Sequence, residues 1–181
     1  MKVTKAQAQA NRAHIVETAS LLFRERGYDG VGVADLMATA GFTHGGFYKH
    51  FGSKADLMAE AAACGLQASS AITAGVERTA FIDYYLSRQH RDARGSGCTL
   101  AALGGDAARQ PAAIKAQFAK GIENMLDGLA DKDQDGRSRA EHLNMFARLV
   151  GALVLSRACP DDSLLADEIL AACRDQLLDA A

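Results

Sequence analysis

The apolar residues of this chain recur with the period of an α-helix along almost its whole length, and no segment shows the alternation of a β-strand. The first periodic segment covers residues 5–25 and stops before Gly27, a residue type that commonly ends helices. Its apolar residues Ile15, Leu22 and Phe23 share one face. The pattern predicts an all-α fold whose first helix packs beneath the segments that follow.

Residues 33–54 predict two short helices joined by a tight turn, with a third helix immediately beyond. The first short helix ends at Gly41, because glycine favours the left-handed conformation of a helix stop. Thr43 is a candidate N-cap for the second, and Ser53 is a candidate N-cap for the longer helix after it. This order of elements predicts a helix-turn-helix.

Counting the helix that begins at Ser53, the rest of the chain predicts six helices, and a glycine-rich turn, a polar loop and a proline separate the later ones. Their approximate ranges are 53–68, 72–90, 99–108, 111–129, 138–158 and 163–179. The breaks between the later helices fall at residues 94–97, at residues 131–136, and at Cys159 and Pro160.

Composition indicates a protein with one or two small domains, no membrane segment and an uneven charge distribution. A chain of 181 residues that is 49% hydrophobic can bury the cores of one or two small domains. It has no apolar run near 20 residues and a polar N-terminus without a signal peptide, so we expect a cytoplasmic protein that does not enter a membrane. Residues 1–54 hold seven Lys or Arg and four Asp or Glu, whereas the remainder holds thirteen and eighteen. A basic segment on an acidic body suits a protein with one phosphate-facing domain.

Several residues of the helix-turn-helix segment occur together at fixed spacing. They are Gly27 and Tyr28, Ala40 and Gly41, Gly45 and Tyr48, His50 and Phe51, and Ser53 and Lys54. With them, residues 10–57 resemble the N-terminal DNA-binding domain of the TetR family of one-component repressors. The resemblance implies a three-helix DNA-binding domain over residues 1–54 and a helical effector-binding and dimerisation domain over residues 55–181.

The resemblance implies a DNA-binding transcriptional regulator, a repressor that a small-molecule or thiol-reactive effector releases from a palindromic operator. Thr43, Tyr48 and Lys54 are then expected to meet phosphates. The expected base-facing edge comprises His44, Gly45 and Gly46, and the expected surface also includes Lys49 and His50. Val31 and Gly32 depart from the family, whose members commonly carry a Thr or Ser there that caps the second helix and touches a phosphate.

In the same family, central helices of the second domain enclose an effector pocket. The residues implied to line it are Phe81, Tyr84, Tyr85, Cys98, Leu103, Phe118, Ile122 and Met125. Tyr84, Tyr85 and His90 carry polar groups that suit the orientation of a guest. An aromatic and methionine stripe at helical spacing is equally typical of a plain core, and the residues do not identify the effector.

Cys98 precedes the helix predicted at residues 99–108, where unpaired backbone donors and the helix dipole favour a thiolate. The alternative is a small buried residue without reactivity. Some members of the family sense oxidants or electrophiles through cysteine, which makes Cys98 a candidate sensor. The other cysteines, Cys64, Cys159 and Cys173, are too dispersed for a zinc site and are expected to be thiols.

The last two predicted helices are apolar over more than one stripe, whereas a surface helix needs only one. The resembling family dimerises through a four-helix bundle of its last helices. We therefore expect a homodimer whose interface includes Phe146, Val150, Val154, Leu165, Ile169 and Leu177. The alternative is that both of these helices are fully buried core helices, with no dimer interface.

Two further points concern metal binding and catalysis. Residues 131–136 copy the opening of an EF-hand, but position 12 would be His142 and Glu141 comes one place early, so we expect a solvated loop.

The chain has no GxSxG, phosphate-binding glycine loop or HExxH, and we expect neither an enzyme nor a bound cofactor. The second function class is a helical interaction module that retains the helix-turn-helix only as a scaffold.

Overall fold

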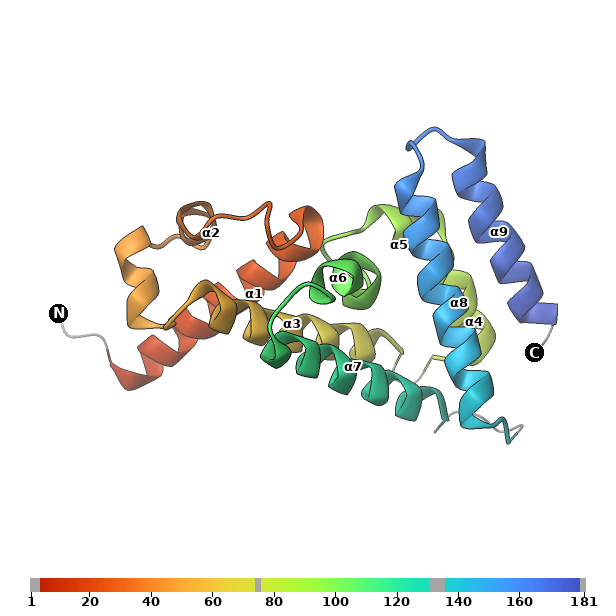
Figure 1. The fold of residues 1–181 in the computed structure, drawn as a ribbon, viewed down its shortest axis with the longest axis horizontal. Coiled ribbons are helices and arrows are strands. Elements are labelled where there is room, and N and C mark those ends of the chain that lie inside the picture. The colour runs from red at the N-terminus through yellow and green to blue at the C-terminus, as the bar shows by residue number, and fades with distance from the viewer. Residues whose placement is uncertain (1–3, 74–75, 131–135, 180–181) are drawn as a thin grey trace.

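The computed structural model describes residues 4–73, 76–130 and 136–179, and every regular element in these ranges is helical (Figure 1). The elements are α1 (Lys5–Arg26), α2 (Val33–Thr39), the 3₁₀ helix η1 (His44–Lys49), α3 (Lys54–Thr73), α4 (Arg78–Tyr85), α5 (Arg88–Asp92), α6 (Thr99–Ala107), α7 (Ala112–Ala130), α8 (Arg139–Ala158) and α9 (Leu164–Asp179). The predicted all-α class is confirmed. The α1, α2 and η1 group lies at one end, and the α8 and α9 pair lies at the other.

α1 has the boundaries that the sequence predicts, and local hydrogen bonds explain them. The Thr4 side chain accepts the backbone N–H of Gln7 at 3.2 Å and so caps the first turn. Gly27 ends the helix with a φ of 74°, a conformation that side chains with a Cβ rarely adopt. The apolar face of α1 is fully buried at Ile15 and Phe23.

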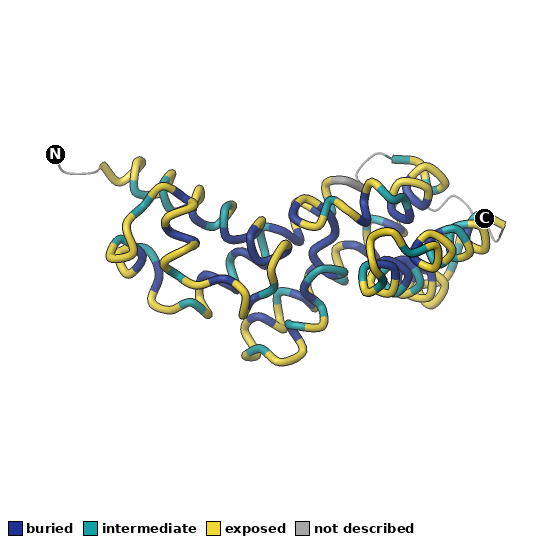
Figure 2. The backbone as a smooth tube through the Cα atoms, turned by 90° about the horizontal axis from the view of Figure 1, so that it is seen from above, coloured by how far each residue is buried: buried dark blue, intermediate teal, exposed yellow. Residues whose placement is uncertain are grey.

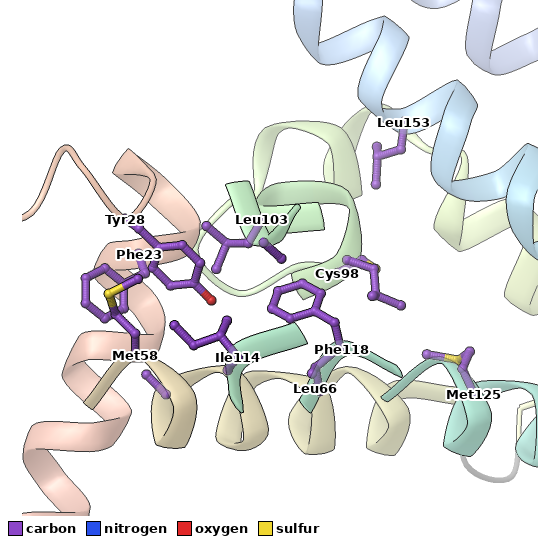
Figure 3. Packing of buried hydrophobic residues seen from close by; sticks show 14 of the residues in the cluster. Phe23, Tyr28, Met58, Leu66, Cys98, Leu103, Ile114, Phe118, Met125 and Leu153 are labelled. Carbon is purple, nitrogen blue, oxygen red and sulfur yellow. The ribbon is translucent and has the colours of Figure 1, made fainter. Parts of the chain in front are cut away.

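α3 joins the two ends of the molecule. It packs against α1 and α7, so the helix that begins at the predicted domain boundary belongs to both domains (Figure 1). Ser53 caps it as predicted, since its hydroxyl accepts the N–H of Asp56 at 3.1 Å. The helix continues to Thr73, five residues beyond the predicted end at residue 68. Leu66, Phe118 and Ile114 fill the space between α3 and α7 (Figure 3).

The single helix predicted over residues 72–90 is wrong. α4 and α5 are separate helices with a break at Leu86 and Ser87, because each has its own N-cap. The Glu77 carboxylate accepts the N–H groups of Thr79 and Ala80, and the Ser87 hydroxyl accepts the N–H of His90 at 3.1 Å. The break turns the chain so that α5 contacts α8.

α8 and α9 form an antiparallel pair that a buried arginine ties to α5. α8 begins with a capping box between Ser138 and Glu141. The Arg91 side chain is 1% exposed and donates to the Ser156 hydroxyl at 3.0 Å and to the Cys159 carbonyl at 3.2 Å. Arg91 thereby fixes α5 against the end of α8 where the chain turns into α9.

Two expectations concern membranes and metals. Among the described residues, no helix combines the length and the apolar character that crossing a bilayer requires. Residues 131–135, which hold most of the EF-hand-like pattern, lie outside the described residues. In the part of the chain that the structure describes, no cluster of His, Cys, Asp and Glu side chains could hold a metal ion.

Candidate functional site

The turn between α2 and η1 places a short helix on the surface of the N-terminal domain. Gly41 takes a φ of 80°, and the N–H of Phe42 closes the end of α2 by donating to the Met37 carbonyl at 2.8 Å. α2 starts without a side-chain cap, since Gly32 has no side chain and Val31 is fully buried. The structure therefore lacks the hydroxyl cap from residues 31 and 32 that the family commonly has.

η1 is anchored by one aromatic side chain and exposes the others. Phe47 is buried, whereas the next residue, Tyr48, is 68% exposed. Thr43, His44, Gly45 and Lys49 are also exposed. The helix is of the 3₁₀ type, and Thr43 is its N-cap residue, as the sequence predicts, although the Thr43 side chain makes no cap hydrogen bond.

The two glycines of η1 have free space around them. A Cβ on Gly45 would meet no atom within 4 Å. A Cβ on Gly46 would meet the Met37 Cε and the Thr43 Oγ1 at an ordinary contact distance of 3.6 Å. Packing within this chain therefore does not require a glycine at either position, and the pair leaves the backbone of η1 open to a close approach from outside.

The remaining two predicted DNA contacts, His50 and Lys54, are half-buried. The Lys54 ammonium donates to the Tyr28 carbonyl at 2.6 Å and so holds the end of α1. The His50 carbonyl accepts a 3.3 Å hydrogen bond from Arg12, which also forms an ion pair with Glu60. The hydrogen bond to Glu60 raises the pKa of Arg12 above its ordinary value.

α6 contacts α1 at both of its ends. On the N-terminal side, the buried Arg24 guanidinium donates to the Gly95 carbonyl at 2.6 Å and to the Thr99 hydroxyl at 3.3 Å. On the C-terminal side, Asp106 accepts the backbone N–H of Tyr28 at 3.2 Å. Burial lowers the pKa of Arg24 below its ordinary value. These bonds link the position of α6 directly to the helix beneath the helix-turn-helix.

A small cavity lies beside the start of α6. Its volume is about 10 Å³, the space of one water molecule. The lining residues are Ser69, Phe81, Tyr84, Tyr85, His90, Cys98 and Met125. The Tyr85 hydroxyl is buried and has no hydrogen-bond partner among the described residues. Burial raises the pKa of Tyr85 well above its ordinary value, and the neighbouring Cys98 adds to the rise.

Cys98 and His90 form the polar side of this cavity. His90 donates its Nδ1–H to the Tyr85 carbonyl at 2.8 Å and accepts the Cys98 N–H at Nε2 at 3.1 Å, so the imidazole is neutral. Burial lowers the pKa of His90 and favours that neutral form. The Cys98 side chain is 3% exposed, so a reagent can reach the thiol only when the surrounding helices move (Figure 3).

The sequence predicts eight residues at an effector pocket, and in the structure only some of them line the cavity beside α6. Five line the cavity, whereas Leu103 and Phe118 are buried in the core and Ile122 is half-buried at its edge. Ser69 was missed, although a serine at helical spacing from Ala62 and Leu66 marks a polar group on a buried face. Contact of the five residues with a ligand stays a prediction.

Much of the α8 and α9 pair is exposed (Figure 2), and the exposed residues include large apolar side chains, so the alternative of two fully buried core helices is wrong. The exposed large apolar residues of the pair are Leu143, Val154, Leu155, Leu164 and Leu165. Of the residues predicted for a dimer interface, Val154 and Leu165 are exposed, and Val150 and Ile169 are half-buried. Phe146 and Leu177 are buried within the chain itself.

These elements define a class of protein, an all-helical chain with an N-terminal helix-turn-helix and a larger helical domain. Residues 15–61 match the family described as bacterial regulatory proteins, tetR family. The chain is also 44% identical over 55 residues to the HTH-type transcriptional regulator TtgR of Pseudomonas putida. That match covers 30% of this chain and 26% of TtgR, so it spans about a quarter of the length of that relative.

Comparison of structures extends the similarity to the whole chain. Reduced Escherichia coli NemR matches with a TM-score of 0.76 at 17% identity, over 94% of this chain and 96% of NemR. AibR, solved with isovaleryl coenzyme A and operator DNA, matches with a TM-score of 0.58 at 17% identity, over 92% of this chain and 97% of AibR. Such identities show the fold alone. Residues 15–61 of this chain match the tetR family, as their sequence predicts, and the whole chain shares its fold with a solved TetR-family transcriptional regulator from Agrobacterium tumefaciens, with a TM-score of 0.75 at 21% identity over 96% of this chain and 98% of that one.

Proposed function

We propose that this protein is a cytoplasmic transcriptional regulator that binds a palindromic DNA operator as a homodimer and releases it when an effector acts on the second domain. The observation that carries the proposal is the exposed η1, which lies within the segment that matches the tetR family. The fold relative AibR was solved with operator DNA and an acyl coenzyme A, which supports an operator and an effector as the two partners.

The proposed DNA contact uses η1 in the major groove, one copy from each protomer. His44, Gly45 and Gly46 present the base-facing edge, while Thr43, Tyr48 and the neighbouring lysines meet phosphates. Tyr48 is exposed, whereas the neighbouring Phe47 is buried and anchors η1 in the core, which supports Tyr48 as a residue that contacts DNA. The open surroundings of Gly45 support a close approach of the backbone to DNA.

A gel shift with the DNA upstream of the protein's own gene tests the proposal, because family repressors commonly bind beside their own genes. Wild type is expected to bind specifically. Gly45→Leu is expected to fold, since the site has room, but to lose about 1000-fold in affinity because its side chain blocks the groove.

The matched control is Gly105→Leu, which adds the same side chain to an exposed glycine in α6 that also has open surroundings. We expect this variant to bind DNA like wild type. No specific binding by wild type contradicts the DNA-binding function and favours the interaction module. Binding by Gly45→Leu at wild-type strength contradicts the close approach of η1.

For the effector, we propose a thiol-reactive compound that modifies Cys98. Conjugate addition to a quinone joins the Cys98 sulfur to a ring carbon, and the thiol proton ends on the quinone. A cavity of about 10 Å³ cannot accept such an adduct, so α4 and α6 must move apart. Because α6 is bonded to Arg24 and Tyr28, this movement shifts α1 under the helix-turn-helix and weakens operator binding. Reversible binding of an apolar molecule in the opened cavity is the alternative.

Gel shifts of wild type and Cys98→Ser after treatment with a benzoquinone separate these effectors. The serine variant keeps the other three cysteines and is the matched control for nonspecific modification. We expect wild type to release DNA and the variant to keep it. Equal release by both proteins, or release by neither, shows that Cys98 is not the sensor.

A further inference from the structure

The Cys98 cavity contains a hydrogen-bond donor that the fold itself does not use. Tyr85, from α4, lines the cavity and is 3% exposed, and its hydroxyl has no hydrogen-bond partner among the described residues. Leaving a buried hydroxyl unpaired costs free energy, because the group has lost water and gained nothing in exchange. Such a group points to an acceptor that binds in the cavity.

The neighbouring polar groups of the cavity are already paired. The Ser69 hydroxyl donates to the Gly65 carbonyl at 2.8 Å. His90 uses one ring nitrogen for the Tyr85 carbonyl and the other for the Cys98 N–H. Among the buried side-chain oxygen and nitrogen atoms of the described residues that line this cavity, the Tyr85 hydroxyl alone lacks a partner.

The Tyr85 hydroxyl adjoins the Cys98 thiol, which adds to the rise that burial causes in the pKa of Tyr85. Arg157, on α8, is close enough to interact electrostatically with both residues. Its Nε and Nη2 donate to the Arg91 and His90 carbonyls, each at 2.9 Å, while its buried Nη1 has no partner among the described residues. A neutral donor and a cation therefore both favour negative charge on an atom bound beside the sulfur.

We propose that Tyr85 determines the specificity of the reaction at Cys98, and that its hydroxyl donates to the carbonyl oxygen of an α,β-unsaturated carbonyl compound. This inference rests on Cys98 as the reacting residue of the proposed function. In the addition, the sulfur forms a bond to the β-carbon, the electron pair of the carbon–carbon double bond moves toward the carbonyl group, and the oxygen takes the negative charge of an enolate. The thiol proton ends on the α-carbon, which restores the carbonyl group.

The position of the hydroxyl suits this role, because the attacked carbon and the carbonyl oxygen belong to one short conjugated unit. A donor that adjoins the sulfur is therefore within reach of the oxygen on which negative charge develops. A donor fixed beside that oxygen in a buried site stabilises the transition state more than the ground state. An alkylating agent without a carbonyl group receives no such stabilisation from Tyr85.

Rates of Cys98 modification in the purified full chain, without DNA, test the proposal. The reagents are methyl vinyl ketone, a small unsaturated ketone, and methyl iodide, which alkylates a thiol and has no carbonyl group. Mass spectrometry of peptides follows Cys98 and, in the same sample, Cys159, a half-buried cysteine outside the cavity. The quantity compared among variants is the ratio of the ketone rate to the iodide rate, because a change in how often the helices open affects both rates.

Tyr85→Phe removes the hydroxyl and keeps the ring. We expect it to lower the rate ratio at Cys98 about tenfold and to leave the ratio at Cys159 unchanged. Tyr28→Phe is the matched control, because Tyr28 is 1% exposed, has a buried hydroxyl without a partner among the described residues, and lies outside the cavity. This variant is expected to keep the wild-type ratio at both cysteines, and circular dichroism checks that both variants are folded.

Three outcomes overturn the proposal. The first is an unchanged ratio at Cys98 in a folded Tyr85→Phe. The second is an equal fall of the ratio in Tyr28→Phe, which would make the effect a general one of the core. The third is a Cys98 that does not react with the ketone in wild type. An unchanged ratio still leaves Cys98 as the reacting residue, whereas the proposed regulation fails when the modified protein keeps its operator.

Discussion

Two lysines of the helix-turn-helix domain lie five residues apart in different environments. Lys49 is exposed, and its ammonium makes no hydrogen bond with a described residue. Lys54 is half-buried, donates to the Tyr28 carbonyl at 2.6 Å and lies over the Phe23 ring at 5.9 Å. Lys54 therefore has a structural role in addition to the phosphate contact proposed for it.

We expect Lys49→Ala and Lys54→Ala to weaken operator binding on all sequences and to flatten its salt dependence by about one unit each. Only Lys54→Ala is expected to lower the free energy of unfolding, by about 1–2 kcal/mol, because it removes a charged hydrogen bond to a backbone carbonyl. Urea unfolding and gel shifts at several salt concentrations measure the two effects. An unchanged salt slope in Lys54→Ala would exclude this lysine from the DNA interface.

Single residues also mark the limit of what the sequence predicts about the site. The apolar face of a helix identifies buried positions, and Phe81, Phe118 and Met125 are indeed buried. Periodicity does not tell which buried residue borders a cavity, because that depends on how side chains from several elements meet. Phe118 fills the core, whereas Ser69, a residue without an apolar signal, lines the cavity.

At the scale of elements, the periodicity of apolar residues predicted where helices occur. The prediction failed where the residue that caps a helix was not recognised. The segments corresponding to α1, α2, α6, α7, α8 and α9 were predicted with small differences at their ends. α4 and α5 were merged because Glu77 is an uncommon capping residue, and Ser87 was not interpreted as a second cap. η1 has apolar residues at helical spacing, but adjacent Gly45 and Gly46 favour no particular helix, and a 3₁₀ helix results.

The contact between α3 and α7 depends on a glycine. A Cβ on Gly121 would lie 2.6 Å from the Leu66 Cδ2, and Leu66 is itself buried. Gly121 thus allows α7 to approach α3 closely, and α3 is the helix that directly follows the helix-turn-helix. By contrast, Gly128 lies seven residues further along α7 and has no atom within 4 Å of the position of a Cβ.

We expect Gly121→Ala to destabilise the protein by about 1–3 kcal/mol, because Leu66 must leave its position in a packed core. Gly128→Ala on the same helix is expected to stabilise it by up to about 1 kcal/mol through helix propensity. Thermal unfolding of the two variants against wild type measures both changes. Equal and small effects would mean that Leu66 moves aside at little cost and that the approach of α3 to α7 is not fixed by Gly121.

At the scale of the whole molecule, the proposed DNA-binding helix and the proposed dimer face lie at opposite ends (Figure 1). A protomer offers one η1, and a palindrome is recognised by two such helices at a fixed separation. The apolar surface of α8 and α9 would set that separation. Among its residues, Val154 is 43% and Leu165 is 53% exposed, one on each helix.

We expect wild type to be a dimer in light scattering at micromolar concentration, and Val154→Glu and Leu165→Glu to be monomers, because each places a carboxylate in an apolar interface. Leu21→Glu is the control, since Leu21 is 45% exposed on α1, far from this face. The monomers are expected to bind a half-site with the affinity of wild type. They are expected to bind the palindrome much more weakly than wild type, because a monomer has only one DNA-binding domain and loses the gain of bivalent binding. A monomeric wild type, or variants that remain dimers, would place the interface elsewhere.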